Sequence, residues 1–307
     1  MNANARIIKD AKRTTRVVGY HGSHHEMLRV FTSDRWKEMT DWAKTIGLEI
    51  ETSCNWYNIH SARGEASESI GALLQEVVFK EFPQDLVRWE QDGSISGAEC
   101  VTQCMTKEFI RNHYAQFKNL FDEYLPRFGM LPTDECGMHT NIGLGMLGDT
   151  DEKRLETARK LYYFVNKYFD LSCTLFNRSR RAVGYCGRMD GWQNAKTLDP
   201  SRQPNSHYVS FNWGHFYEGP RKARVELRLV GPQKNFAQFR NTMETIFHLI
   251  SACKRCSWDD MDKLEKVFKG CNRYVLDRLS KCRRNGLISD GMYEEIKAKA
   301  DMETIYI

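Results

Sequence analysis

The chain has 307 residues, of which 41% are hydrophobic and 12% aromatic, which is enough to build a packed core. Its formal net charge of +5 permits an anionic ligand such as a nucleotide but does not require nucleic acid. No apolar run approaches the roughly 18 residues of a membrane span, and the first residues lack the apolar segment of a signal peptide. We therefore expect a cytoplasmic chain without a membrane partner, whose ten cysteines are reduced.

The N-terminal part predicts a helix and a strand after a basic start. Residues 1–33 are basic and irregular, and we expect them to form an N-terminal extension. The pair at 33–34 is typical of a helix cap, which predicts a helix through Trp42. Residues 47–52 alternate between apolar and acidic side chains, which predicts a strand with its acidic residues on one face.

The middle of the chain predicts helices and strands in alternation. In order they are a helix over 67–82, strands over 87–92 and 95–102, a helix over 107–125 and a strand over 137–144. Asp92 and Gly93 separate two of these strands, and an Asp-Gly pair in that place indicates a hairpin turn. Pro126 is expected to stop the long helix.

The last part of the chain is richer in helices. In order we expect a helix over 151–176, a polar segment over 177–206, strands over 208–213 and 223–230, a helix over 235–253 and two or three more helices after 258. The polar segment is longer than structureless connections usually are, so it is a candidate lid over a substrate.

These elements predict an α+β fold. Strands joined by long helices, with hairpin-like pairs, favour a mainly antiparallel sheet flanked by helices. The division that we expect is a basic extension over 1–33, a main domain over 34–255 and a helical C-terminal extension over 256–307.

Acidic and imidazole side chains lie on or beside several of the predicted strands: Glu49, Glu51, Asp92, Glu99, His139 and Glu226. Each alone also fits a solvated strand face, a structural histidine or a cross-strand ion pair. Together, carboxylates with a histidine suit Mg²⁺ or Mn²⁺. Planar donors for carboxylate or phosphate oxygens are available from Arg180, Arg181, Arg188 and Arg228. Divalent metals beside arginines are typical of phosphoryl transfer.

The order of these residues resembles the amidoligase family, carboxylate–amine ligases that share the catalytic fold of glutamine synthetase. The segments that carry the resemblance are 47–51, 92–102, 136–141, 181–186 and 225–228, within a span of roughly 46–231. The Cys-Gly-x-His and Asp-Gly-Ser…Gly-Ala-Glu patterns are the most specific among them. The resemblance implies that the main domain over 34–255 has a curved, mainly antiparallel sheet of the glutamine synthetase type.

The resemblance also implies roles for the acidic residues and the histidine. Glu49 and Glu51 would be metal ligands on the first strand of the sheet, and Glu99, with Asp92, would add the second acidic contribution. His139 and Glu226 would bind the metal that bridges the phosphates of ATP.

For the other polar residues the resemblance implies contacts to substrates. Arg228 would contact the transferring phosphoryl group or the substrate carboxylate, and Arg181 and Arg188 would lie near the acyl substrate. Asn141 stands where the family usually has a second histidine; it would face the nucleotide, to which an amide still offers hydrogen bonds.

The implied reaction is ATP-dependent amide-bond formation. Transfer of the γ-phosphoryl group of ATP to a carboxylate makes an acyl phosphate, which an amine then attacks. The cofactors would be ATP with Mg²⁺ or Mn²⁺, and the substrates a carboxylate and an amine such as an amino acid, a peptide or a polyamine. The alternatives are a metal-dependent phosphodiesterase or nuclease, which needs no nucleoside triphosphate, and a non-catalytic binding module that keeps the fold.

Other candidate metal ligands receive no role. The histidine cluster His21, His24 and His25 lies in the basic extension and is expected to be solvated. Cys253 and Cys256 have a zinc-like spacing, but they fall at a predicted helix end without a second close pair.

Overall fold

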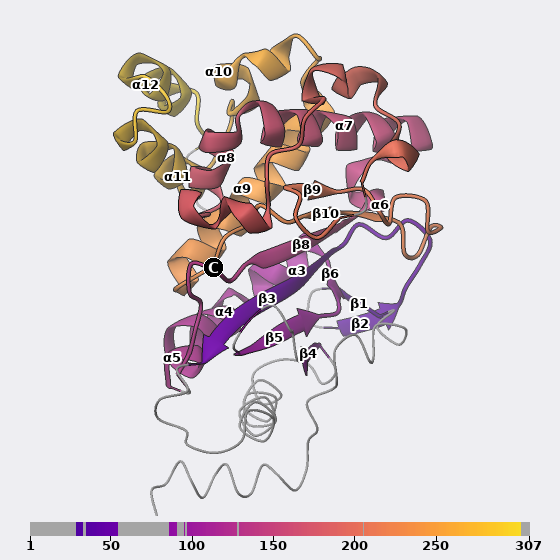
Figure 1. Cartoon of the computed structure of the whole chain (residues 1–307), viewed down its shortest axis with the longest axis vertical. Helices are drawn as coiled ribbons and strands as arrows, with labels where there is room; N and C mark the ends of the chain where they lie inside the picture. Colours follow the sequence, from indigo (N-terminus) through magenta and orange to yellow (C-terminus); the bar gives the residue numbers. More distant parts are fainter. Residues whose placement is uncertain are drawn as a thin grey trace, which may run out of the picture. The chain divides into compact units, whose positions relative to one another are not determined.

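The computed structural model describes residues 29–32, 35–54, 86–90, 95, 97–127, 129–204 and 206–301. The histidine cluster of the basic extension, the predicted helix over 67–82 and Asp92 lie outside these residues. The chain forms two compact units. The first comprises Met1–Met39, Ile46–Met138 and Pro232–Phe236, and the second comprises Thr40–Thr45, His139–Gly231 and Ala237–Ile307. Each has paired strands accompanied by helices, which confirms the α+β class (Figure 1).

The strands of the first unit pair mainly antiparallel. They are β1 (Arg29–Thr32), β2 (Arg35–Glu38), β3 (Ile46–Cys54), β4 (Val87–Glu90), β5 (Gly97–Thr102), β6 (Cys104–Met105) and β7 (Met130–Leu131). β3 pairs antiparallel with β5, β6 and β7, and β4 pairs antiparallel with β5, which confirms the predicted strand pair. The pairing of β1 with β6 is parallel.

Strand β3 follows the alternation of its sequence. Leu48 and Ile50 are 1% and 2% exposed and belong to the core, where Ile50 lies opposite the buried Cys100 of β5. The intervening Glu49 and Glu51 project to the other face, because successive side chains of a strand alternate.

The predicted helix from 34 through Trp42 is wrong, because this segment forms strand β2. β1 and β2 are antiparallel, with Thr32 opposite Arg35 and Phe31 opposite Trp36. The aromatic residues Phe31 and Trp36 favour strands. β1 also lies within the range predicted as the N-terminal extension.

The predicted helix over 107–125 is present but divided. It consists of α3 (Lys107–Asn112), α4 (Tyr114–Asn119), the π-helix η3 (Leu120–Tyr124) and α5 (Leu125–Arg127). The Thr106 side chain caps α3 by accepting a hydrogen bond from Phe109 N at 3.1 Å. Within η3, Asp122 Oδ1 accepts a hydrogen bond at 2.8 Å from Phe236 N, the first amide of a later helix.

Among the described residues, the second unit contains three strands and most of the helices. They are β8 (Met138–Gly143, beginning at the last residue of the first unit), α6 (Leu144–Leu147), α7 (Asp151–Lys167), α8 (Phe169–Leu175), η4 (Arg180–Tyr185), η5 (Trp192–Thr197), η6 (Pro200–Arg202), β9 (Phe211–Asn212), β10 (Arg224–Leu227), α9 (Phe236–Arg255), η7 (Asp260–Asp262), α10 (Leu264–Val267), α11 (Arg273–Arg284) and α12 (Asp290–Ala298). β10 pairs antiparallel with both β8 and β9. The predicted helices after residue 258 are confirmed, and they belong to the same unit as α7 to α9.

Two predicted segments of the second unit differ in detail. The helix over 151–176 is interrupted at Tyr168, and the polar segment over 177–206 contains the short 3-10 helices η4, η5 and η6 instead of being structureless. β9 and β10 are shorter than predicted, so that Arg228 follows the end of β10.

Candidate functional site

Strands β3 and β5 bring acidic side chains onto one face of the first unit. Glu51 lies directly opposite Glu99, and Glu49 lies opposite Val101. Residues that are directly opposite on neighbouring strands project to the same face, so Glu49, Glu51 and Glu99 share it. Glu51 and Glu99 are each only 5% exposed. Two buried carboxylates side by side repel each other, and a bound cation would relieve that repulsion.

The chain just before β8 is anchored to Glu51. Glu51 N donates to Gly137 O at 3.0 Å, and Gly137 N in return donates to the Glu51 carboxylate at Oε2. The Cys-Gly-x-His segment and the Glu-x-Glu segment, distant in sequence, are therefore joined through backbone and side-chain hydrogen bonds.

In the second unit, Glu226 is the centre of a charged network on the β8–β10–β9 ladder. Its register partners are Asn141 on β8 and Asn212 on β9. Glu226 Oε2 accepts a hydrogen bond from Asn212 Nδ2 at 3.0 Å, and Oε1 accepts from Arg228 Nη1. His139 Nδ1 lies 3.7 Å from the same Oε1. The Glu226 and Arg228 side chains are only 6% and 12% exposed, so the pair is largely removed from water.

Two arginines frame this network. Arg228 Nε donates to the carbonyl oxygen of His207 at 2.9 Å, which fixes the guanidinium beside Glu226. Arg224 Nε donates to Asn141 Oδ1 at 3.0 Å, while its Nη1 pairs with Glu218 Oε2 at 3.1 Å. Burial alone would raise the pKa of Glu218, but the hydrogen bond from His215 and the charge of Arg224 hold that pKa below its usual value.

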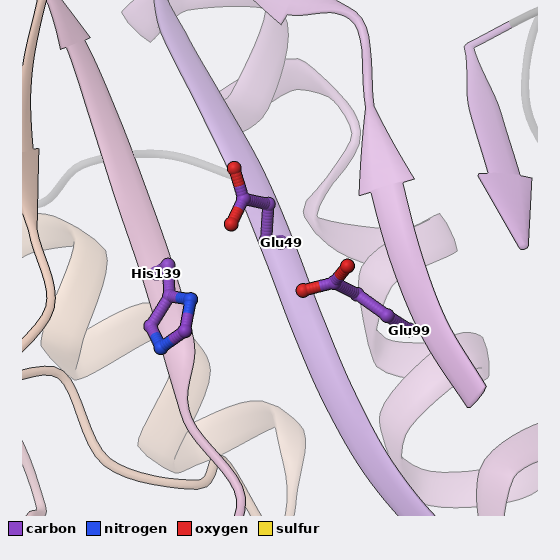
Figure 2. A group of neighbouring side chains, drawn as sticks. All are labelled: Glu49, Glu99 and His139. Carbon is purple, nitrogen blue, oxygen red and sulfur yellow. The ribbon is translucent and has the colours of Figure 1, made fainter. Parts of the chain in front are cut away.

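Three of the predicted metal ligands form a compact group. Glu49, Glu99 and His139 each offer a ligand atom, and these atoms lie within 4.8 Å of one another (Figure 2). Ligands of an octahedral Mg²⁺ with bonds of about 2.1 Å are about 3 Å apart when adjacent and about 4.2 Å when opposite. Two carboxylates and an imidazole are thus a donor set that could hold one ion. Oxygen ligands with a single imidazole also suit Mn²⁺.

The other predicted site residues are not part of this group of three. Glu51 and Glu226 are not members of that group, although Glu226 is in contact range of His139. Asp92 lies outside the described residues, and Arg181 belongs to η4. Arg188 is exposed, and its Cζ lies 5.4 Å from the centre of the Trp192 ring.

The centre of the predicted lid is tied to α7. Tyr162 donates its hydroxyl to Asp190 O at 3.0 Å, Arg159 Nε donates to Leu198 O at 2.8 Å, and Asn166 Oδ1 accepts from Met189 N at 2.8 Å. Burial raises the pKa of Tyr162 to about 12, so its hydroxyl remains a donor at neutral pH. A small polar cavity of about 230 Å³ adjoins these contacts, lined by Tyr162, Asp190, Gly191, Asn194, Thr197, Leu198 and Gln203. A lid would have to consist of the parts that flank this anchored centre.

The cysteine pair does not form a metal site with other described residues. Cys253 and Cys256 are buried, and burial raises the pKa of both thiols, which disfavours the thiolate that zinc requires. Within the described ranges, the cluster of Glu49, Glu99 and His139 is the one group of three or more acidic, histidine or cysteine side chains close enough to share an ion.

Sequence reasoning gave no role to Asn212, to Arg224 or to its partner Glu218. Asn212 is 2% exposed and belongs to a two-residue strand, which leaves no alternation to interpret. One sequence signal was available: Asn212 lies near the end of the predicted strand that comes just before the strand of Glu226.

Among the residues that the structure describes, no helix combines the length and the apolar character needed to cross a bilayer. A scan against protein-family models and a search of curated proteins both find no match to this chain.

Proposed function

We propose that this chain is an ATP-dependent carboxylate–amine ligase with a catalytic fold like that of glutamine synthetase, as its resemblance to the amidoligase family implies. The observation that carries the proposal is the compact group of Glu49, Glu99 and His139. The resemblance is carried by separate segments, and the group includes one ligand from each of the Glu-x-Glu, Gly-Ala-Glu and Cys-Gly-x-His segments. A resemblance by chance would give no reason for these three to gather.

The donor set fits a divalent metal. Two carboxylates and an imidazole occupy the group, and the Oε1 atom of Glu226 lies 3.7 Å from His139 Nδ1, a separation suited to two ligands of one ion. Glu51 lies opposite Glu99 and adds a further buried carboxylate. A divalent ion bound here would supply positive charge that offsets the negative charge of a triphosphate and a carboxylate substrate.

The residues of the chain would orient the reactants. Arg228 is fixed by His207 O and Glu226, so its guanidinium is preorganised to stabilise charge on the phosphoryl oxygens during transfer to the substrate carboxylate. Asn141 would contribute an amide to the nucleotide, in an orientation that Arg224 maintains. Arg181 and Arg188 are proposed for the acyl substrate, and the flanks of the 177–206 segment would keep water from the acyl phosphate.

The test is an activity assay with product analysis. The protein is incubated with ATP, Mg²⁺ or Mn²⁺, and pooled amino acids, peptides and polyamines. We expect ADP to be released together with a new amide detected by mass spectrometry. Glu226→Ala should abolish turnover, with circular dichroism as the check that the fold is kept.

Other outcomes would replace the proposal. Cleavage of DNA or RNA without a nucleoside triphosphate would establish the phosphodiesterase alternative. A protein that binds neither ATP nor a divalent metal would establish the non-catalytic binding module. Unchanged amide formation by Glu226→Ala would refute the site assignment alone.

A further inference from the structure

Asn212 is a buried amide whose two polar atoms are both committed. Its Nδ2 donates to Glu226 Oε2 at 3.0 Å, and its Oδ1 accepts from Gly214 N at 2.9 Å. The side chain is 2% exposed. Because the backbone amide of Gly214 can only donate, it sets which end of the Asn212 amide is the oxygen, and the NH₂ group must then face Glu226.

We propose that Asn212 is a positioning residue that presents Glu226 to the metal through one oxygen. This inference rests on the proposed function, in which Glu226 is a metal ligand. A free carboxylate rotates and can bind an ion through either oxygen or both. Here Oε2 is held by Asn212, while Oε1 faces His139 Nδ1 and Arg228 Nη1. The hydrogen bond to Asn212 thus fixes the carboxylate plane before any ion arrives.

The register of the ladder makes this arrangement specific. Asn212 lies directly opposite Glu226 on β9, so its side chain reaches the carboxylate across one strand spacing. Polar groups that orient a metal ligand typically change metal affinity about 10–100-fold when they are removed. A residue that merely fills space would change the stability of the fold and leave metal affinity unaltered.

The experiment measures Mn²⁺ binding to the full chain by isothermal titration calorimetry. We expect Asn212→Ala to bind Mn²⁺ about 10–100-fold more weakly than the unaltered chain. The matched control is Asn272→Ala. Asn272 also donates through Nδ2 to a buried carboxylate, Glu244 Oε2 at 3.0 Å, and also accepts backbone amides through Oδ1, but it caps α11. The control should lose stability and keep its Mn²⁺ affinity.

A double substitution tests whether Asn212 acts through Glu226. In a Glu226→Ala background, Asn212→Ala should cause no further loss of Mn²⁺ affinity, because the carboxylate that it orients is already gone. If Asn212→Ala does not fold, Asn212→Ser, which keeps a smaller polar side chain, is measured in its place and should weaken binding in the same direction.

The inference is overturned if folded Asn212 variants bind Mn²⁺ as the unaltered chain does, or lose no more affinity than Asn272→Ala. Neither result depends on turnover, so the outcome is separate from that of the proposed function. If the unaltered chain forms no amide but the variants show the Mn²⁺ affinities expected above, the proposed ligase activity is contradicted and the role of Asn212 is not. An unaltered chain that binds no Mn²⁺ would overturn both.

Discussion

Buried carboxylates have different neighbours in the two strand ladders. On β3 and β5, Glu51 stands directly opposite Glu99, so that like charges face each other at about 5% exposure. On β8, β10 and β9, Glu226 is surrounded by Asn212, Arg228 and His139, which are donors or potential cations. The first arrangement brings two acidic side chains together, whereas the second surrounds one carboxylate with donors, so we expect an added cation to matter more to the first. The difference predicts opposite responses to substitution.

The largest loss of stability is expected when the β8–β10–β9 ladder loses the cation Arg228. Arg228→Ala leaves the Glu226 carboxylate buried without its guanidinium partner. Removal of one member of a buried ion pair typically costs about 3–5 kcal/mol of unfolding free energy. Urea unfolding measures this loss. The double variant Arg228→Ala with Glu226→Ala should recover part of the stability, because the uncompensated charge is removed as well. A single variant within about 0.5 kcal/mol of the unaltered chain would show that the pair is not buried in solution.

The next largest effect is the stabilisation that we expect when Mn²⁺ is added. Mn²⁺ at 100 times its dissociation constant should stabilise the chain by about 2.7 kcal/mol against urea, since it binds only the folded state. Glu99→Gln or His139→Ala should remove most of that shift, because each deletes a member of the group of three. Asp262→Asn, which alters an exposed partner of Lys167, is the control and should keep it. A full shift in Glu99→Gln would place the ion elsewhere.

The predictions that were confirmed rest on a regular spacing of side chains. The alternation in 47–52 correctly predicted that Glu49 and Glu51 lie on one face of the strand and the buried Leu48 and Ile50 on the other. The same rule predicted the strand of His139. Spacing in one strand says nothing of its neighbour's register, however. The opposition of Glu51 to Glu99 depends on a pairing between segments that the sequence separates by some 40 residues.

Where the sequence failed, the local signal was shared by two structures. The segment around Trp36 fits a helix or a strand by itself, and its pairing with β1 decides for the strand. The 3-10 helices of the polar 177–206 segment were not predicted, because contacts such as those with Tyr162 and Asn166 are made to α7. The contact between Asn212 and Glu226 joins residues 14 apart on neighbouring strands, and no spacing within one strand reveals it.

The smallest effect has the opposite sign to that of Arg228→Ala, and it tests the comparison most sharply. Glu51→Gln keeps an oxygen to accept from Gly137 N but removes one of the two facing charges. Side chains directly opposite on neighbouring strands have Cβ atoms about 5 Å apart. Two charges at that separation repel by about 3 kcal/mol at an effective dielectric constant of about 20. An amide oxygen is a weaker acceptor than a carboxylate by about 1 kcal/mol. Without metal, Glu51→Gln should therefore be more stable than the unaltered chain by about 1–2 kcal/mol in urea, whereas Glu226→Gln should be less stable. With saturating Mn²⁺ the advantage of Glu51→Gln should shrink, because the ion already offsets the repulsion. Equal destabilisation by both substitutions would contradict this difference between the two ladders.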